Sequence, residues 1–167
     1  MKKIWAPWRM EYILKAIEEK DDSCFFCTGI EEKNDRKNLI LHRSSLAFVM
    51  LNRFPYNNGH LMVVPYRHNG DFLKLSRDEK ADLSDLLQLS VQVLIDLMQP
   101  EGFNIGMNLG RVAGAGVADH LHYHIVPRWD GDTNFMPVIS DTKVISEALE
   151  ASYDKLHSAF LQRTGEK

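Results

Sequence analysis

Polar and apolar side chains alternate along residues 119–126, which read Asp-His-Leu-His-Tyr-His-Ile-Val. Such alternation predicts a β-strand, in which successive side chains point to opposite faces. The polar rings belong to His120, His122 and His124. They would share one face, each about 6.6 Å from the next, while the Leu, Tyr and Ile between them pack the other face into a core. We predict a strand from about residue 120 to 126 that ends at Pro127.

Other apolar runs, rich in Val, Phe and Leu, are typical of further strands. They cover residues 39–41, 46–51, 60–64 and 103–109. Residues 52–59 contain Pro, Gly and three Asn, which predicts a long turn between two of these strands. We expect a turn carrying both cysteines at 23–29, a charged loop at 31–38 and a turn at Asp130-Gly131-Asp132.

Helical spacing of apolar residues predicts three helices. The longest follows Ser76-Arg77-Asp78-Glu79, a capping-box sequence, and keeps its period until Pro100. Shorter helices are expected over residues 10–20 and 144–161. Because short turns join most of the strands, antiparallel pairing is favoured. The fold class is therefore α+β, with an antiparallel sheet, a long packed helix and a C-terminal helix.

The composition is that of an ordinary globular domain, with 167 residues of which 44% are hydrophobic and 26% charged. The formal net charge of -3 argues against non-specific nucleic-acid binding, which usually requires a basic surplus. No window approaches the length of an apolar transmembrane helix, and the N-terminus lacks the apolar run of a signal peptide. We expect a single cytoplasmic domain over residues 1–167 that binds neither nucleic acid nor membranes.

A row of imidazoles on a rigid strand can supply a nucleophile, a proton donor or metal ligands near neutral pH. A lone histidine on a strand is usually an ordinary core or surface residue, but three at alternate positions favour a site. Spacing alone leaves two interpretations open. The histidines could bind zinc, even all three on one ion of a small hydrolase, or one could remain free for covalent catalysis.

Glycines occupy positions 110, 114 and 116 in the loop just before the histidine strand. Glycine allows backbone N–H groups to converge on phosphate oxygens and form an anion site, and Arg111 could add positive charge. The alternative is a flexible connection without a ligand. The adjacent histidines favour the phosphate site.

Cys24 and Cys27 are the only cysteines and form a single C-x-x-C. This spacing is typical of metal ligands but supplies only half of a tetrahedral zinc site. By residue type, the remaining ligands could come from His42, His60, His68 or His120. The alternatives are a redox pair and buried cysteines that behave as small apolar residues. Zinc is favoured, because no strand precedes the motif as in redox proteins.

The stretch His-Leu-His-Tyr-His-Ile-Val at 120–126 resembles the signature of the histidine-triad (HIT) superfamily, H-φ-H-φ-H-φ-φ with φ apolar. Residues 48–68 are similar to the family's paired strands, which lead to a proline and a histidine before a long helix. Asn108 stands where the family has an Asn ahead of its phosphate loop. The matching core spans about residues 24–130, with helical extensions at both ends.

Two flanking segments narrow the resemblance. Trp5-Ala6-Pro7-Trp8-Arg9 and Pro127-Arg128-Trp129 resemble a bacterial subgroup described as diadenosine tetraphosphate phosphorylases or ATP adenylyltransferases. The Gln of the sugar-1-phosphate uridylyltransferase branch is replaced by His124 here, which disfavours that role.

The resemblance implies a homodimer whose sheets join and an enzyme acting on nucleotides. It would be a hydrolase or nucleotidyltransferase that cleaves dinucleoside polyphosphates or related adenylylated compounds at the α-phosphate. His122 would attack to form a nucleotidyl-histidine, which water or phosphate then releases, and His124 would lie near the phosphate oxygens. A nucleotide-binding or regulatory module with a structural zinc and no turnover is the alternative.

The resemblance also implies the ligand contacts. Ribose and base would be bound near Phe48, Leu51 and Asn52. Phosphates would be held near Asn108, Arg111, Gly114, Gly116 and Val117, mostly by the backbone, since the Ser, Thr or Gln of many relatives is missing here. Some members with a C-x-x-C bind zinc, and the corresponding ligands are Cys24, Cys27, His68 and His120.

Overall fold

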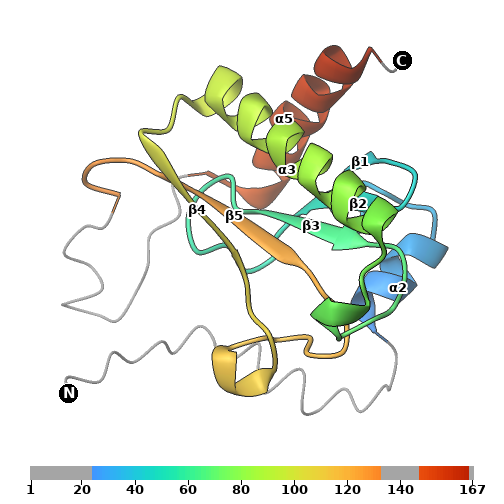
Figure 1. Cartoon of the computed structure of the whole chain (residues 1–167). Coiled ribbons are helices and arrows are strands. Elements are labelled where there is room, and N and C mark those ends of the chain that lie inside the picture. Colours follow the sequence, from blue (N-terminus) through green and yellow to red (C-terminus); the bar gives the residue numbers. More distant parts are fainter. Residues whose placement is uncertain (1–23, 133–146, 166–167) are drawn as a thin grey trace, which may run out of the picture.

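The computed structural model describes residues 24–132 and 147–165, and these contain a five-stranded sheet (Figure 1). The strands are β1 (Ile40–Arg43), β2 (Ala47–Leu51), β3 (Leu61–Pro65), β4 (Gly102–Met107) and β5 (Tyr123–Arg128). Their order is β1-β2-β3-β5-β4, and every neighbouring pair is antiparallel. The predicted antiparallel α+β fold is confirmed. The helix predicted over residues 10–20 and the Trp-containing segment 5–9 lie outside the described residues.

The helices in the described residues are α2 (Phe25–Glu31), α3 (Arg77–Met98) and α5 (Leu149–Thr164). Short 3₁₀ turns, η1 (Phe72–Lys74) and η2 (Arg111–Ala113), lie between them. The capping box is present: the Ser76 hydroxyl accepts the Glu79 N–H at 3.1 Å, and the Glu79 carboxylate accepts the Ser76 N–H at 2.8 Å. No helix in the part of the chain that the structure describes is long and apolar enough to cross a membrane.

The segment predicted as a turn around the cysteines is helical from Phe25, so that prediction is wrong. The Phe26 ring is buried against residues of β1, β2 and β3, and Ile30, one helical turn later, packs against the same cluster. Tertiary burial therefore stabilises a helix that its short sequence does not signal.

The strand containing the triad begins at Tyr123 rather than 120 and continues through Pro127 to Arg128. Its start is late because the Leu121 N–H donates to the Asn69 carbonyl oxygen, at 2.9 Å, instead of to a strand. Pro127 is tolerated because pairing with β3 ends at Ile125, so that only β4 lies beside this part of β5.

The sheet has two differently covered faces. On one face, α3 and α5 lie side by side and bury alternate strand residues such as Val49, Val63 and Ile125 (Figure 1). On the other face, Phe26 of α2 packs against a smaller apolar cluster of Phe48, Met50, Met62 and Val64 from β2 and β3. His124 pairs with Met62 across the β3–β5 ladder, so its side chain lies on the α2 face.

Candidate functional site: a polarised histidine row beside a cysteine and histidine cluster

The three triad rings lie on the α2 face, although only His124 is inside β5. The ring centroids of His120 and His122 are each 5.1 Å from that of Phe26. The His122 and His124 centroids are 4.9 Å apart. The shared face indicated by the alternating pattern is thus present, even though the first two histidines precede the strand.

His122 is held in one tautomer by the backbone. Its Nδ1 lies 2.9 Å from the carbonyl oxygen of His120, and because a carbonyl only accepts, Nδ1 carries the proton and donates. Burial lowers the pKa of His122, which favours the neutral ring. Nε2 is then an unprotonated nitrogen with an available lone pair, as nucleophilic catalysis by histidine requires.

His124 is held by the buried His60, the residue immediately before β3. The His60 Nε2 and the His124 Nδ1 are 2.9 Å apart. The Nδ1 of His60 accepts the Tyr56 N–H at 3.0 Å, so the ring proton of neutral His60 is on Nε2 and is donated to His124. In the neutral His124 ring the proton is then on Nε2. The arrangement presents a basic nitrogen on His122 and a protonated one on His124.

From the sequence, His60 was a candidate only as a metal ligand. The structure instead places its ring against that of His124. Its contact with His124 depends on the register between β3 and β5, which aligns Leu61 with Ile125 and Met62 with His124. The sequence does contain one signal for His60, because it is a polar residue between the Asn52–Gly59 turn and an apolar strand.

A second group of side chains lies at the other end of the row. The ligand-type atoms of Cys24, Cys27, His68 and His120 all lie within 4.8 Å of one another. The Nδ1 of His120 is 3.3 Å from the Cys24 sulfur and 3.6 Å from the Cys27 sulfur, and the Nδ1 of His68 is 3.5 Å from the Cys27 sulfur. Zn–S bonds of about 2.3 Å and Zn–N bonds of about 2.0 Å at tetrahedral angles place adjacent S and N atoms about 3.5 Å apart. The cluster could therefore hold a metal ion.

The hydrogen bond of the other His120 ring nitrogen, Nε2, also fits a metal-binding role. Its Nε2 lies 2.8 Å from the carbonyl oxygen of Pro65, so Nε2 donates and Nδ1 faces the cysteines unprotonated. Metal-binding histidines usually donate their other ring N–H in this way, which orients the ring.

The Cys27 thiol does not have the lowered pKa that is typical of a reactive cysteine. Burial, together with the neighbouring Cys24, raises the pKa of the Cys27 thiol to about 11. Reactive cysteines instead have lowered pKa values. A bound cation would favour both thiolates and reverse the effect.

The remaining metal candidates lie elsewhere. His42 of β1 stacks on Phe160 of α5 with ring centroids 5.9 Å apart, on the helix-covered face. Within the described residues, the cysteine and histidine cluster is the only group that could hold a metal ion, and it includes one triad histidine. The geometry thus gives no support to a site with all three triad histidines on one metal.

The glycine-rich loop closes on itself before the triad. Gly110 and Gly114 have positive φ angles of 80° and 94°, which glycine adopts without strain. The Asn108 side-chain amide donates to the Gly114 carbonyl at 3.4 Å. Within the described part of the chain, no hydrogen bond uses the N–H groups of Gly116 or Val117. These donors are therefore available to an anion, and Arg111 is exposed nearby.

The residues expected near ribose and base do not lie on one face of the sheet. The Asn52 side chain accepts the Phe54 N–H at 2.9 Å, and its amide nitrogen lies 3.4 Å from the Nδ1 of His60. Phe48 belongs to the buried cluster on the α2 face and stacks on Tyr66. Leu51 points to the opposite, helix-covered face, so the structure does not bring it to the triad.

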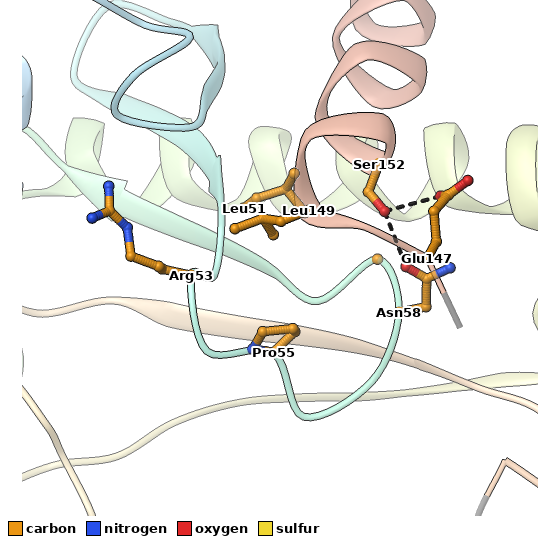
Figure 2. A pocket seen from close by; sticks show the side chains of 8 residues that line it. Leu51, Arg53, Pro55, Asn58, Glu147, Leu149 and Ser152 are labelled. Atoms are coloured by element: carbon orange, nitrogen blue, oxygen red, sulfur yellow. Dashed lines mark hydrogen bonds between the residues drawn. The ribbon is translucent and has the colours of Figure 1, made fainter. Parts of the chain in front are cut away.

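Leu51 instead lines a cavity of about 220 Å³ between the Asn52–Gly59 turn and the start of α5. Pro55 and Leu149 form other walls, and Ser152 hydrogen-bonds both Asn58 and Glu147 at its edge (Figure 2). This cavity lies on the helix side of the sheet and contains none of the triad histidines.

Comparisons with known proteins agree with this arrangement. A profile of the HIT domain matches residues 33–131. The AP-4-A phosphorylase of Mycobacterium tuberculosis is 40% identical over 154 residues, which cover 89% of this chain and 79% of that protein. A Zn-bound histidine triad family protein from Mycobacterium smegmatis has the same fold, with a TM-score of 0.68 and 23% identity over 87% of this chain and 98% of that one.

A further solved structure is a hypothetical histidine triad nucleotide-binding protein from Sulfolobus tokodaii. Its TM-score is 0.66 at 26% identity, and the match covers 85% of this chain and 92% of that one. Since the domain profile matches more than half of the sequence, and the mycobacterial phosphorylase shares 40% of its residues over most of its length, the chain belongs to the HIT-domain family.

Proposed function

We propose that this protein is a HIT-family nucleotidyl-transferring enzyme that cleaves dinucleoside polyphosphates at the α-phosphate. The observation that carries the proposal is the polarised pair of histidines, with the Nε2 lone pair of His122 beside the protonated His124. The mycobacterial relative, named AP-4-A phosphorylase, supports diadenosine tetraphosphate as substrate and phosphate as acceptor.

The chemistry proceeds in two displacements. In the first, the His122 Nε2 forms a bond to the α-phosphorus and the bond from phosphorus to the bridging oxygen breaks. The departing oxygen accepts a hydrogen bond from the His124 Nε2–H and leaves as the anion of ATP. In the second, phosphate attacks the adenylyl-His122, the P–N bond breaks, the Nε2 lone pair of His122 is restored, and the His124 Nε2–H again donates to the oxygens around the reacting phosphorus. The products are ATP and ADP, and water in place of phosphate would give AMP.

Backbone and side-chain donors would stabilise the charge on the transferred phosphoryl group. We assign this role to the N–H groups of Gly116 and Val117, with Gly114 and Asn108 shaping the loop and Arg111 adding positive charge. Asn52, beside His60, is the residue placed to contact the ribose.

We propose zinc as the ion of Cys24, Cys27, His68 and His120. Two thiolates and two imidazoles form a typical closed structural zinc site, and a related fold is described as Zn-bound. Such an ion would stabilise the segments that carry these four residues.

We also propose a homodimer joined through β4. This strand is an edge of the sheet, and Asn104, Ile105 and Gly106 are exposed along it. An exposed edge with an apolar side chain is suited to pairing with another strand. Sedimentation analysis should find a dimer, and Ile105→Lys should shift it to monomer. A wild-type monomer at micromolar concentration would refute this part.

A reducing, cytoplasmic location is proposed on the state of the two cysteines. Both are free thiols, and both belong to the cysteine and histidine cluster that could hold a metal ion. Cell fractionation followed by immunodetection tests this location, and recovery from an oxidising compartment would contradict it.

The decisive experiment separates the enzyme from a non-catalytic module. Purified protein is mixed with diadenosine tetraphosphate, with and without phosphate, and both products and intact protein mass are measured. We expect repeated turnover to ATP and ADP only with phosphate, and, without phosphate, a mass gain of one AMP with release of one ATP per chain. His122→Ala should lose both, whereas the control His157→Ala, on α5, should keep both. A folded wild type without turnover or adduct would favour the module.

A further inference from the structure

Asp132 follows β5 in the segment Asp130-Gly131-Asp132, for which the sequence indicated only a turn. The turn is present, since the Asp132 N–H donates to the Trp129 carbonyl at 3.1 Å. The carboxylate, however, is not a typical turn side chain, because only 7% of its surface is exposed. A buried carboxylate must be fully paired to be tolerated.

Among the described residues, donors from Arg128, Trp129 and Asn57 meet that carboxylate. Arg128 donates through Nε at 2.6 Å and Nη2 at 3.0 Å, and the Trp129 N–H lies at 3.3 Å. Asn57, from the turn before β3, donates its Nδ2–H at 2.9 Å. The ion pair alone does not explain the burial, because 46% of the Arg128 side chain is exposed and solvent screens the pair.

Asn57 is the link between this carboxylate and the rest of the molecule. It is buried, and its two amide hydrogens go to Asp132 and to the Pro127 carbonyl oxygen, the latter at 3.0 Å. The backbone carbonyl oxygen of Asn57 accepts the His60 backbone N–H at 3.2 Å. Asn57 therefore ties the Asn52–Gly59 turn to the residues that end β5.

The same turn fixes the histidine that pairs with the triad. The Tyr56 N–H donates to the His60 Nδ1, and the His60 Nε2 contacts the His124 Nδ1. Because His124 lies in β5 and Asp132 follows that strand, the turn and the adjoining His60 are attached to the β5 segment at two places. One is the Asp132 and Asn57 pair, and the other is the His60 and His124 pair.

We propose that Asp132 is a positioning residue for the hydrogen bond to the leaving group, acting through Asn57 to hold the turn in which the Tyr56 N–H sets the tautomer of His60. His60 in turn keeps the His124 proton on Nε2, from which it is donated in a hydrogen bond to the departing oxygen. The effect on the reaction rate rests on the proposed function. The effect on the tautomers of His60 and His124 does not. Releasing Asn57 would loosen the Tyr56 N–H from His60 and mix the tautomers of both rings.

The kinetic test compares two leaving groups on the same adenylyl group. The departing oxygen of ATP accepts a hydrogen bond from His124, whereas fluoride, a less basic leaving group, depends less on that bond when it leaves adenosine 5′-fluorophosphate. Asp132→Ala should lower kcat for the tetraphosphate about 10–100-fold, as for a misplaced hydrogen-bond donor to developing charge, with less than about a threefold change in KM. The fluorophosphate rate should fall less than about threefold. Asp132→Asn, which keeps an acceptor oxygen for Asn57, should restore part of the rate.

A double-mutant cycle tests the route of the effect. If Asp132 acts through Asn57, the double Ala variant should be no slower than the slower single variant. Asp130→Ala removes an exposed carboxylate two residues away and is the matched control, expected to behave as wild type. Additive losses, or equal losses for both leaving groups, would overturn the proposal.

Nitrogen-15 NMR of the histidine rings gives a readout that does not require turnover. Wild type should show His60 and His124 protonated on Nε2 only, and Asp132→Ala should show mixed Nδ1 and Nε2 protonation. Unchanged tautomers in a folded variant would refute the positioning role even if the enzyme is active. Conversely, a tautomer change in a protein without turnover would keep this role and reject the proposed function.

Discussion

The backbone carbonyl of His120 accepts the Nδ1–H of His122 at 2.9 Å, while the His120 ring faces the Cys24 sulfur. One residue therefore belongs both to the metal-type cluster and to the support of the proposed nucleophile. Restraint of the His120 ring also restrains the carbonyl that selects the tautomer of His122. The cluster can thus influence the proposed reaction through the position of this carbonyl.

Removal of the metal should consequently lower both stability and rate. Cys24→Ala should lose the expected one zinc per chain, because three ligands hold the ion much more weakly. We expect a lower melting temperature and a kcat reduced about tenfold, as for disrupted supporting contacts at metal sites. Elemental analysis, thermal unfolding and steady-state kinetics measure these effects. A wild-type protein without zinc would contradict the expectation.

Replacement of His60 should impair the reaction while the fold persists. His60→Phe keeps the buried ring volume but removes the donor to the His124 Nδ1. The kcat for diadenosine tetraphosphate should fall about 100-fold, the scale of losing one hydrogen-bond donor to developing charge. His42→Phe is the matched control, since His42 stacks on Phe160 on the helix-covered face. Equal activity in the two variants would remove His60 from the mechanism.

The fold was largely predictable because its signals are local and periodic. The run Leu61–Pro65 and the capping box at Ser76 specify their elements without help from distant residues. The start of β5 was not predictable, because it depends on the Asn69 carbonyl taking the Leu121 N–H. Likewise α2 depends on a buried place for Phe26 that exists only in the folded sheet.

The site was predictable where one strand or one motif contains it. The period of two placed the three triad histidines on one face, and the C-x-x-C marked two ligand-type residues. The contacts of His60 and Asp132 could not be predicted, because both residues bond to the Asn52–Gly59 turn. No local pattern encodes which strand that turn will meet.

Acid should weaken the ion pair that connects Arg67, the residue before His68, to Glu79 of α3. Arg67 donates to the Glu79 carboxylate at 2.7 Å, and this pairing, with help from Ser76, lowers the pKa of Glu79 from 4.5 to about 2. A lowered folded-state pKa stabilises the fold above pH 4.5, and this contribution is lost as the pH falls from 4.5 toward 2. Because Arg67 is about half exposed, we expect only about 1–2 kcal/mol at neutral pH.

Urea unfolding of Glu79→Gln across pH measures this contribution. The stability difference from wild type should be largest above pH 5 and should shrink between about pH 4.5 and 2. Asp78→Asn removes a charge from the same helical turn and, among the described residues, breaks no ion pair. A Glu79→Gln difference that does not change with pH would show that the carboxylate charge is unimportant.

Gly70 tests how closely the segment after His68 packs on the backbone before His120. A Cβ at Gly70 would lie 2.7 Å from the Ala118 carbonyl oxygen and 2.9 Å from the Asp119 Cα, so backbone would have to move. Gly70→Ala should cost about 1–3 kcal/mol of unfolding free energy, as overpacking does, and should weaken zinc retention against a chelator. Gly102→Ala is the control, since a Cβ there meets nothing within 4 Å. If the two variants unfold at the same urea concentration and release zinc equally, the two segments do not restrain each other.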